Sequence, residues 1–301
     1  KKASVILFAY NEFRRVKDRI SEQNRWSLRK ESKPPANQIK EVSKNTVGKV
    51  LAIANQKGGV GKTTTSVNLA ASLNATRKKV LLVDLDPQGN ATMGSGVDKA
   101  GLSNSMYELL TGEAEFDKVV LSLEGVDYHL LPANGDLVAA EIELMSVENR
   151  EFQLRKLLEK VKNDYDFIVI DCPPSLNMLT INGLVSADSL LIPAQCEYYA
   201  LEGLSSLMST IETIKVSLNP SLKIDGLLRT MFDPRNNLAL EVSKQLTDHF
   251  GDLVYRTVIP RNIKLAEAPS HGLPALLYDR SSSGAAAYLA LAGEMLRKES
   301  N

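Results

Sequence analysis

Runs of apolar residues alternate with longer segments of mixed polarity along most of the chain. Strands are predicted at seven runs rich in Val, Ile and Leu: KVLAIAN, KKVLLVDLD, VDYHLLPA, YDFIVIDCPP, SLLIPAQ, KIDGLLRTMF and VYRTVIP. Helices are predicted at 61–76, 137–145, 148–163, 176–187, 200–217 and 238–250, and over the closing segment SSGAAAYLALAGEMLRKE. Strands that are apolar on both faces are typical of parallel sheets covered by helices on both sides. The pattern therefore predicts an α/β fold with a mostly parallel, twisted sheet.

The first 46 residues differ from the rest. Residues 1–49 hold 13 Lys and Arg against 5 Asp and Glu, whereas the remainder holds 23 against 31. KPPANQIKEVSKN is a polar linker, and VILFAYNEFRRVKDRI before it predicts a basic helix with apolar residues on one side. Three interpretations stay open: an arm that touches DNA or a membrane, an ordinary basic tail, and an upstream reading frame included through a misassigned start. We favour the last, and we predict one domain over residues 47–301.

Composition narrows the class of protein. The chain is 44% hydrophobic and 24% charged, as soluble globular proteins are, and it has no apolar run of about 18 residues that could span a bilayer. Two cysteines, Cys172 and Cys196, do not suggest a disulfide scaffold, so we expect a reducing cytoplasm. His129, His249 and His271 lack the spacing of metal ligands, and we expect structural roles for them.

One glycine-rich segment carries a specific chemical signal. Gly58, Gly59, Val60 and Gly61 follow a predicted strand and precede a predicted helix, as a phosphate-binding loop requires. Its glycines let backbone N–H groups approach phosphate, and the helix N-terminus adds positive potential. The next three residues are expected to contact the nucleotide and its metal ion. Lys62 would hold the β- and γ-phosphates, Thr63 would bind Mg²⁺ and Thr64 would contact the α-phosphate side.

Four segments in order resemble the ParA/MinD/nitrogenase-iron-protein class of ATPases. KGGVGKTTT is similar to the deviant Walker A motif of that class, DLDPQGNAT to its second signature and FIVIDCPPS to its Walker B strand. TVIPRNIKLAEAPSHGLPALLYD is similar to the closing segment of chromosomal ParA/Soj proteins. The resemblance covers about residues 47–299. It implies the three-layer fold of P-loop NTPases, with ATP and Mg²⁺ as cofactors and ATP hydrolysis as the activity.

Acidic residues end two of the predicted strands. Asp84 and Asp86 alternate along the strand KKVLLVDLD, so one of them can point toward bound phosphates. The resemblance implies that Asp86 orients or activates the attacking water and that Asp84 helps organise the Mg²⁺ side. Asp171 ends the run FIVI, where a Walker B acid would bind Mg²⁺ through water.

The loop has one lysine more than phosphate binding requires. The resemblance implies that Lys57 reaches across a nucleotide-sandwich homodimer to the partner's phosphates, as an arginine finger does elsewhere. Dimerisation would then depend on ATP, and hydrolysis on dimerisation. No guanine-reading NKxD motif is present in the expected region, which favours adenine. The resemblance places Pro260, Arg261 and Asn262 near the base.

The motifs indicate an ATPase but are compatible with three cellular roles. A cluster-carrying relative needs suitably placed cysteines or a CxxC motif, and neither Cys172 nor Cys196 matches. A MinD-like ATPase binds membrane through an amphipathic C-terminal helix; here Leu289, Leu291 and Leu296 are expected to pack on the sheet, so no stable membrane association is expected. A MinD-like positioning role stays the alternative to a ParA-like partition role.

For the partition role, the resemblance points to non-specific DNA binding by Arg235 and Lys264. Both are expected in loops that follow strands, where their contacts to phosphates would be salt-sensitive. Relatives usually carry Arg at the second position, and Lys264 keeps the charge without the bidentate geometry. The resemblance further implies a ParB-like activator, a nucleoid-associated location and a role in chromosome or plasmid segregation.

Overall fold

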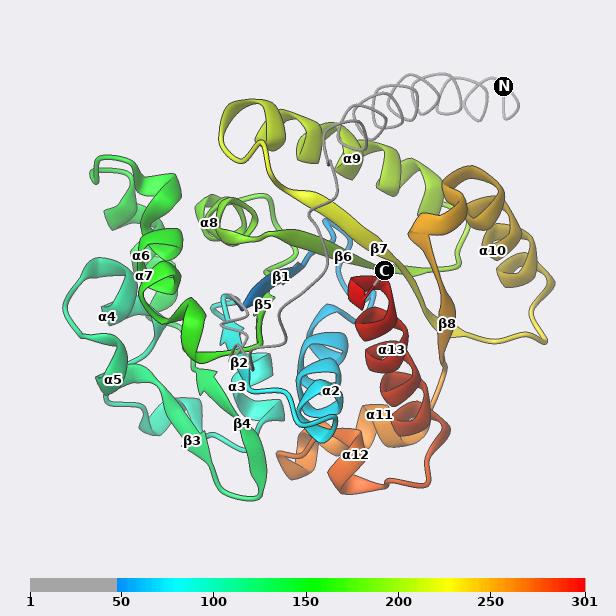
Figure 1. The fold of residues 1–301 in the computed structure, drawn as a ribbon, viewed down its shortest axis with the longest axis horizontal. Coiled ribbons are helices and arrows are strands. Elements are labelled where there is room, and N and C mark those ends of the chain that lie inside the picture. Colours follow the sequence, from blue (N-terminus) through cyan, green and yellow to red (C-terminus); the bar gives the residue numbers. More distant parts are fainter. Residues whose placement is uncertain (1–47, 301) are drawn as a thin grey trace, which may run out of the picture.

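The structure is a computed structural model that describes residues 48–300. An eight-stranded sheet forms the centre of this part, in the order β3-β4-β2-β5-β1-β6-β7-β8 (Figure 1). The strands are β1 (Lys49–Ile53), β2 (Val80–Asp84), β3 (Leu121–Leu123), β4 (Val126–Leu131), β5 (Phe167–Asp171), β6 (Ser189–Gln195), β7 (Lys223–Phe232) and β8 (Val254–Pro260). All neighbours run parallel except β3, which pairs antiparallel with β4. The predicted mostly parallel sheet is confirmed.

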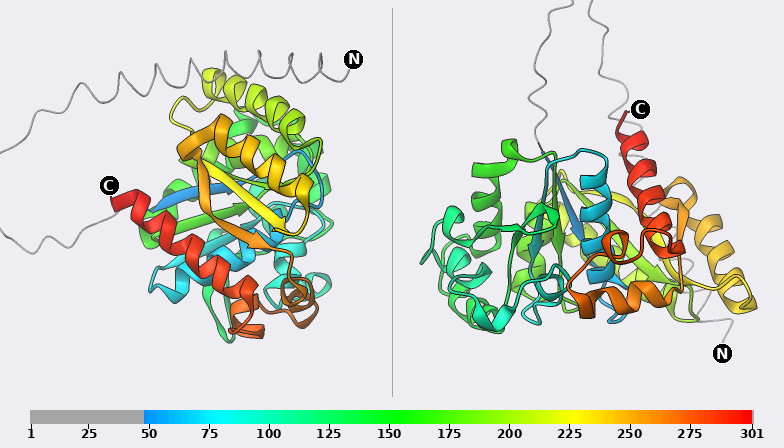
Figure 2. Two further views of the ribbon diagram at one scale, coloured as in Figure 1. Left: turned by 90° about the vertical axis from the view of Figure 1, so that its right-hand side faces the viewer. Right: turned by 90° about the horizontal axis from the view of Figure 1, so that it is seen from below.

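Helices cover both faces of the sheet (Figure 2). One face packs against α2 (Lys62–Ala75), α13 (Ser283–Ser300), α3 (Asn90–Gly94), α11 (Ile263–Glu267) and α12 (Ala275–Tyr278). The other packs against α4 (Met106–Thr111), α6 (Leu137–Leu144), α7 (Gln153–Val161), α8 (Met178–Ser186), α9 (Ala200–Ser217) and α10 (Asn237–Phe250), with α5 (Phe116–Val119) next to α4. The two helix layers explain why the strands are apolar on both sides.

The central strand β1 shows this division residue by residue. Val50 and Ala52 are buried in the core under α8 and α9, whereas Leu51 and Ile53 are buried in the core under α2 and α13. Successive side chains of a strand point to opposite faces, so each face receives alternate residues. β1 lies between β5 and β6, and its carboxyl end is therefore flanked by the carboxyl ends of both neighbours. Ligands of open parallel sheets bind at this edge.

The structure also departs from the predicted elements. The predicted helix over 148–163 is divided into a 3₁₀ turn (Arg150–Phe152), α7 and a second 3₁₀ turn (Lys162–Asp164). The short elements α3, α4, α5, α11, α12 and β3 were not predicted, because segments of three to six residues show too little periodicity. α4 did carry a local signal, since Ser105 and Glu108 form a capping box at its start.

The predicted domain boundary at residue 47 and the interpretations of residues 1–46 lie outside the described residues. The described chain begins at Gly48 and enters β1 one residue later.

Candidate functional site: a phosphate loop with converging acids

The glycine-rich loop connects the carboxyl end of β1 to the first turn of α2. Gly59 and Gly61 have φ values of +73° and +87°, a left-handed conformation that is least costly for glycine. A Cβ on Gly58 or Gly59 would meet nothing within 4 Å. The space beside these two glycines is therefore open, as the close approach of a phosphate to the loop backbone requires.

Asn55 holds the entrance of the loop. Its side-chain amide donates to the Pro193 carbonyl of β6 at 2.7 Å, and its side-chain oxygen accepts the Lys57 N–H at 3.0 Å. Both bonds tie the first loop residues to the neighbouring strand before the chain turns into α2. Asn55 was not among the predicted site residues, although it stands directly before them in the sequence.

Lys62 brings a buried cation to the loop. Its Nζ lies 3.3 Å from the Lys57 carbonyl, and the residue is 7% exposed. Burial lowers the pKa of Lys62, and the nearby carboxylates of Asp171 and Asp86 partly offset this effect. The Lys62 amine thus feels the negative charges of both predicted acids. A bound phosphate would supply further negative charge to the same amine.

Asp171 and Thr63 meet across the sheet edge. The Thr63 hydroxyl donates to Asp171 Oδ2 at 2.8 Å, and the Ser66 hydroxyl donates to Asp171 Oδ1 at the same distance. Burial raises the pKa of Asp171, and these two hydrogen bonds lower it by a smaller amount. A hydroxyl and a carboxylate held together are the hard oxygen groups that suit Mg²⁺. Ser66 was missed by sequence reasoning; its spacing of three residues from Thr63 on one helix face was the available signal.

Asp84 and Asp86 occupy different environments, and the prediction that both lie along one strand is wrong. β2 ends at Asp84, and Asp86 lies in the loop that follows. Asp84 is fully buried beside its register partner Asp171, and it accepts hydrogen bonds from the N–H and hydroxyl of Thr92 at 2.8 and 2.7 Å. Burial and the charge of Asp171 raise the pKa of Asp84 to about 8.

The Asp84–Thr92 contact explains how the loop with Asp86 is placed. The Thr92 hydroxyl also accepts the Ala133 N–H at 2.9 Å, so it joins β2, α3 and the segment after β4. Asp86 is 8% exposed, and its Oδ1 accepts the Gln88 N–H at 2.9 Å. The other Asp86 oxygen has no hydrogen bond from the described residues, which leaves it able to accept one from water.

A contact from a distant strand supports the loop. Thr230 of β7 is 1% exposed, and its hydroxyl donates to the Val60 carbonyl at 2.8 Å. The side chains of Thr230 and Met231 also lie 3.8–3.9 Å from where a Cβ on Gly61 would be. Met231 has a φ of +49°, which is strained for a residue other than glycine. Sequence reasoning missed both residues, because nothing within β7 indicates that its end meets the phosphate loop.

Lys57 lies at the exposed mouth of the loop. Its Nζ pairs with Glu197 Oε2 at 2.6 Å, and both side chains are nearly half exposed. Glu197 follows β6, so this ion pair joins the loop to the segment before α9. The predicted trans-acting lysine is thus accessible to a second subunit, and it has an acidic partner within its own chain.

The segment expected near the base follows β8. Pro260 ends the strand, and the Arg261 N–H donates to the Phe232 carbonyl at 3.2 Å. Asn262 caps the start of α11: its side-chain oxygen accepts the Leu265 N–H at 3.2 Å, and its side-chain amide donates to the Ser283 hydroxyl at 2.8 Å. These contacts fix the segment, and its role at the base stays a prediction.

The two predicted DNA contacts differ in setting. Arg235 lies in the turn between β7 and α10, with a side chain 88% exposed that pairs in two places with Asp233. Lys264 was expected in a loop, and this is wrong, because it belongs to the short helix α11. Its Nζ pairs with Glu267 at 2.9 Å and lies 5.4 Å from the Tyr278 ring centre.

The remaining reactive side chains have structural contacts. Cys172 and Cys196 are buried thiols, His129 lies 2.8 Å from the Tyr165 hydroxyl and His271 stacks on Tyr278. Within residues 48–300 no group of three or more His, Cys, Asp or Glu side chains is placed to hold a metal ion. No helix in the same part has the length and apolarity needed to cross a membrane.

Comparison with known proteins agrees with this geometry. The family model of an AAA domain matches residues 48–224. The sporulation initiation inhibitor protein Soj of Bacillus subtilis (strain 168) is 52% identical over 249 residues, which cover 83% of this chain and 98% of Soj. The chromosome partitioning protein ParA of Myxococcus xanthus (strain DK1622) is 48% identical over 254 residues, which cover 84% of this chain and 90% of that protein.

Solved structures share the fold. The cobyrinic acid a,c-diamide synthase from Mycobacterium smegmatis, with bound ADP and magnesium, superposes with a TM-score of 0.74 at 38% identity over 84% of this chain and 96% of that one. The Pyrococcus furiosus cell division ATPase MinD gives a TM-score of 0.70 at 25% identity over 83% of this chain and 99% of its own. From the sequence identity, the coverage and the fold together, the chain belongs to the Soj/ParA family of chromosome-partitioning ATPases.

Proposed function

We propose that this chain binds ATP with Mg²⁺ at residues 57–64, hydrolyses it as a nucleotide-sandwich homodimer, and uses the cycle to bind and release DNA during chromosome or plasmid segregation. The observation that carries the nucleotide part is the Thr63–Asp171 contact of 2.8 Å beside the buried amine of Lys62. A structural neighbour with bound ADP and magnesium supports the same assignment.

The chain's own residues have distinct roles in this proposal. Lys62 and the loop N–H groups hold phosphate oxygens, while Thr63 and Asp171 hold Mg²⁺, which neutralises charge on the phosphates when it is bound. Asp86 orients the attacking water through the carboxylate oxygen that accepts no hydrogen bond from the described residues. Asp84 of β2 helps to position Asp171, its register partner on β5, and so supports the Mg²⁺ site indirectly.

The role of Lys57 in trans has a direct test. Lys57→Ala should bind ATP but lose hydrolysis and ATP-dependent dimerisation, whereas Lys62→Ala should lose ATP binding. Mixing Lys57→Ala with Asp86→Ala should restore part of the wild-type hydrolysis, because each mixed dimer holds one complete site; about a quarter is the upper limit, which would be reached only if the two variants paired at random. No recovery on mixing, or full hydrolysis by Lys57→Ala alone, would reject the trans assignment.

Non-specific DNA binding is the second part of the proposal. Arg235 is the most exposed of the predicted contacts, and it lies five residues after Thr230, whose hydroxyl contacts the phosphate loop. In gel shifts with ATP, Arg235→Ala should weaken binding to unrelated duplexes equally and make it less steeply dependent on salt. Arg155→Ala on α7 is the control, since the Arg155 side chain is partly exposed and also pairs with an acid, Glu159. Unchanged DNA binding by Arg235→Ala would refute this contact.

A MinD-like membrane role is the alternative, and the packing of α13 speaks against it. Tyr288, Leu291 and Met295 of this helix are buried in the core that includes α2. The apolar side that a membrane would need is therefore already used within the fold. Co-sedimentation with DNA and with liposomes, each with and without ATP, separates the two roles. We further propose a ParB-like activator, which should increase hydrolysis in the presence of DNA.

A further inference from the structure

Asn68 is a buried amide on α2 to which the proposed roles give no part. It lies six residues after Lys62, on the helix that continues the phosphate loop, and it is 5% exposed. Its side-chain amide donates to the Thr64 carbonyl at 2.8 Å, one turn back on the same helix. Its side-chain oxygen accepts the Ala275 N–H at 2.7 Å, which lies 207 residues further along the chain. One buried side chain therefore joins the first turn of α2 to a distant segment.

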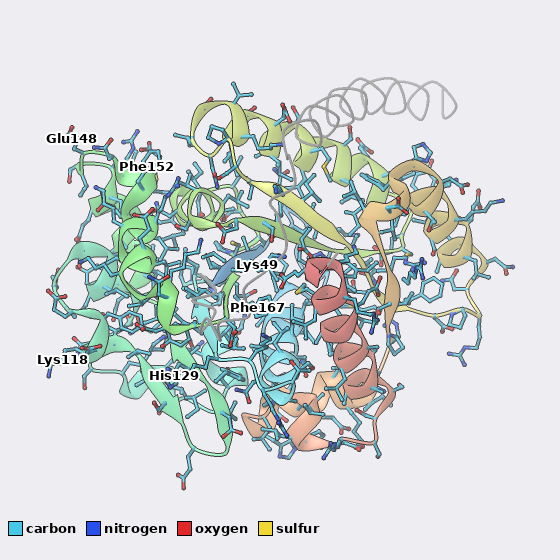
Figure 3. The ribbon with its side chains drawn as sticks, viewed as in Figure 1. Lys49, Lys118, His129, Glu148, Phe152 and Phe167 are labelled. Atoms are coloured by element: carbon cyan, nitrogen blue, oxygen red, sulfur yellow. The ribbon has the colours of Figure 1, made fainter. Side chains whose placement is uncertain are left out.

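The bond from Ala275 caps α12 from outside that helix. Ala275 is the first residue of α12, and Pro274 before it has no side-chain group that could cap the helix. The first N–H groups of a helix have no partner within it, and a side-chain oxygen often supplies one. Here the oxygen belongs to α2, so Asn68 fixes where α12 begins relative to the phosphate-loop helix. Figure 3 shows this segment, in pale orange, next to α2 and α13, which α12 contacts.

Two glycines hold the same segment on another side. Gly96 follows α3, and Gly272 ends the 3₁₀ turn Ala268–His271, with φ values of +87° and +64°. A Cβ on Gly272 would lie 2.6 Å from the Gly96 Cα, and a Cβ on Gly96 would lie 2.9 Å from the Gly272 carbonyl oxygen. The two backbones thus pack directly on each other, which only glycine permits at this distance. The contact fixes the segment against α3, the helix that follows Asp86.

Tyr278 connects α12 to α11. It is the last residue of α12, and its hydroxyl donates to Glu267 of α11 at 3.1 Å. The His271 ring stacks on the same tyrosine, with 4.7 Å between the ring centres. α11 starts directly after Asn262, which is expected near the base. A continuous set of contacts therefore runs from the first turn of α2 to the expected base segment.

We propose that Asn68 is a positioning residue for the base of a nucleoside triphosphate, because it sets the separation between the phosphate loop and the segment after β8. The loop would hold the phosphates, whereas Pro260 and Asn262 would contact the base. A ligand that reaches both parts binds best when their separation is fixed in advance. Loss of the anchor should therefore weaken the contribution of the base and leave phosphate binding intact. This inference rests on the proposed binding of ATP and on the expected base segment.

The test compares ATP with inorganic tripolyphosphate, which has the phosphates without the base, by calorimetry at a constant Mg²⁺ concentration. Asn68→Ala should weaken ATP binding by about fivefold or more and change tripolyphosphate binding by less than about twofold. In steady-state hydrolysis the KM for ATP should rise while kcat stays the same, since the base adds binding that does not change during the reaction. Asn74→Ala is the matched control, because the Asn74 amide lies on the same helix and bonds to the Asp127 carbonyl of β4 at 3.0 Å.

Tyr278→Phe tests the next contact without a change in α2. The variant keeps the ring that stacks on His271 and removes the hydroxyl that donates to Glu267. It should weaken ATP binding with the same selectivity over tripolyphosphate, by a smaller factor than Asn68→Ala. It also gives a result if Asn68→Ala does not fold.

Equal weakening of ATP and tripolyphosphate binding by Asn68→Ala would overturn the inference, since Asn68 would then support the phosphate loop itself. Unchanged ATP binding by folded Asn68→Ala and Tyr278→Phe would overturn it as well. So would wild-type protein that binds tripolyphosphate as tightly as ATP, because the base would then add nothing. Wild-type protein that binds neither ligand contradicts the proposed function, and the inference falls with it.

Discussion

The contact between Thr230 and Val60 gives a quantitative prediction about the phosphate loop. Thr230→Val keeps the shape of the side chain but removes the hydroxyl that donates to the Val60 carbonyl at 2.8 Å. Because Thr230 is 1% exposed, water cannot readily replace this bond. A buried group that loses its partner costs about 1–3 kcal/mol.

That free energy should appear as weaker ATP binding. The bond favours the loop conformation in which Gly59 and Gly61 are left-handed, so its loss lowers the population that is ready to bind phosphate. If the whole free energy of the lost hydrogen bond acts on the equilibrium between binding-competent and other loop conformations, the affinity for ATP drops by about 5- to 150-fold. Since Asp86 and Asp171 stay in place, the rate at saturating ATP should change less than the KM.

The assay is ATP titration by calorimetry together with steady-state hydrolysis and thermal unfolding. Thr230→Ser should behave like the wild type, because it keeps the hydroxyl. Thr213→Val is the control for losing a threonine hydrogen bond elsewhere, since Thr213 lies on the exposed side of α9 and bonds to Ser209. An unchanged ATP affinity in Thr230→Val, with a folded protein, would refute the view that β7 supports the loop.

Three further predictions follow from charged contacts. Glu197→Gln should release Lys57 from its 2.6 Å ion pair and increase ATP-dependent dimerisation a few-fold in light scattering; no change would mean that the pair does not restrain the lysine. Burial and Asp171 raise the pKa of Asp84 to about 8 from an ordinary value of 3.8, so the folded state keeps a proton that the unfolded state loses. The melting temperature of nucleotide-free, Mg²⁺-free protein should therefore fall between about pH 4 and pH 8, and Asp84→Asn should flatten this fall. Hydrogen bonds from Arg235 lower the pKa of the Asp233 carboxyl to about 2, so this carboxyl is charged at neutral pH. Asp233→Asn removes that negative charge and frees the Arg235 side chain. Gel shifts should therefore show tighter DNA binding, and weaker binding would contradict the DNA role of this turn.

Much of the nucleotide site could be predicted because it is local in the chain. The glycines, Lys62 and Thr63 are consecutive, and the loop conformation depends on residues that have no Cβ or that begin a helix. The strands were equally visible, because burial on both faces leaves continuous apolar runs. Predicted and observed bounds coincide for β6, β7 and β8.

The parts that could not be predicted depend on contacts between distant segments. The spacing of Asp84 and Asp86 suggested two acids alternating along one strand, but β2 ends at Asp84, which is buried against β5 and Thr92, while Asp86 turns into the next loop. Lys264 lies in a helix of five residues, too short to show a period.

The sequence by itself determined the kind of fold, the phosphate loop and the family, since these depend on consecutive residues and on the alternation of strands and helices. Only the tertiary structure decided which groups surround that loop. Parallel strands place residues from far along the chain at one edge of the sheet, so Ser66 meets Asp171, Thr230 meets Val60 and Glu197 meets Lys57. The exposed apolar side of α6 was likewise a tertiary result, because a helix pattern shows which residues are apolar but not which side the neighbouring elements, here α4 and α8, cover.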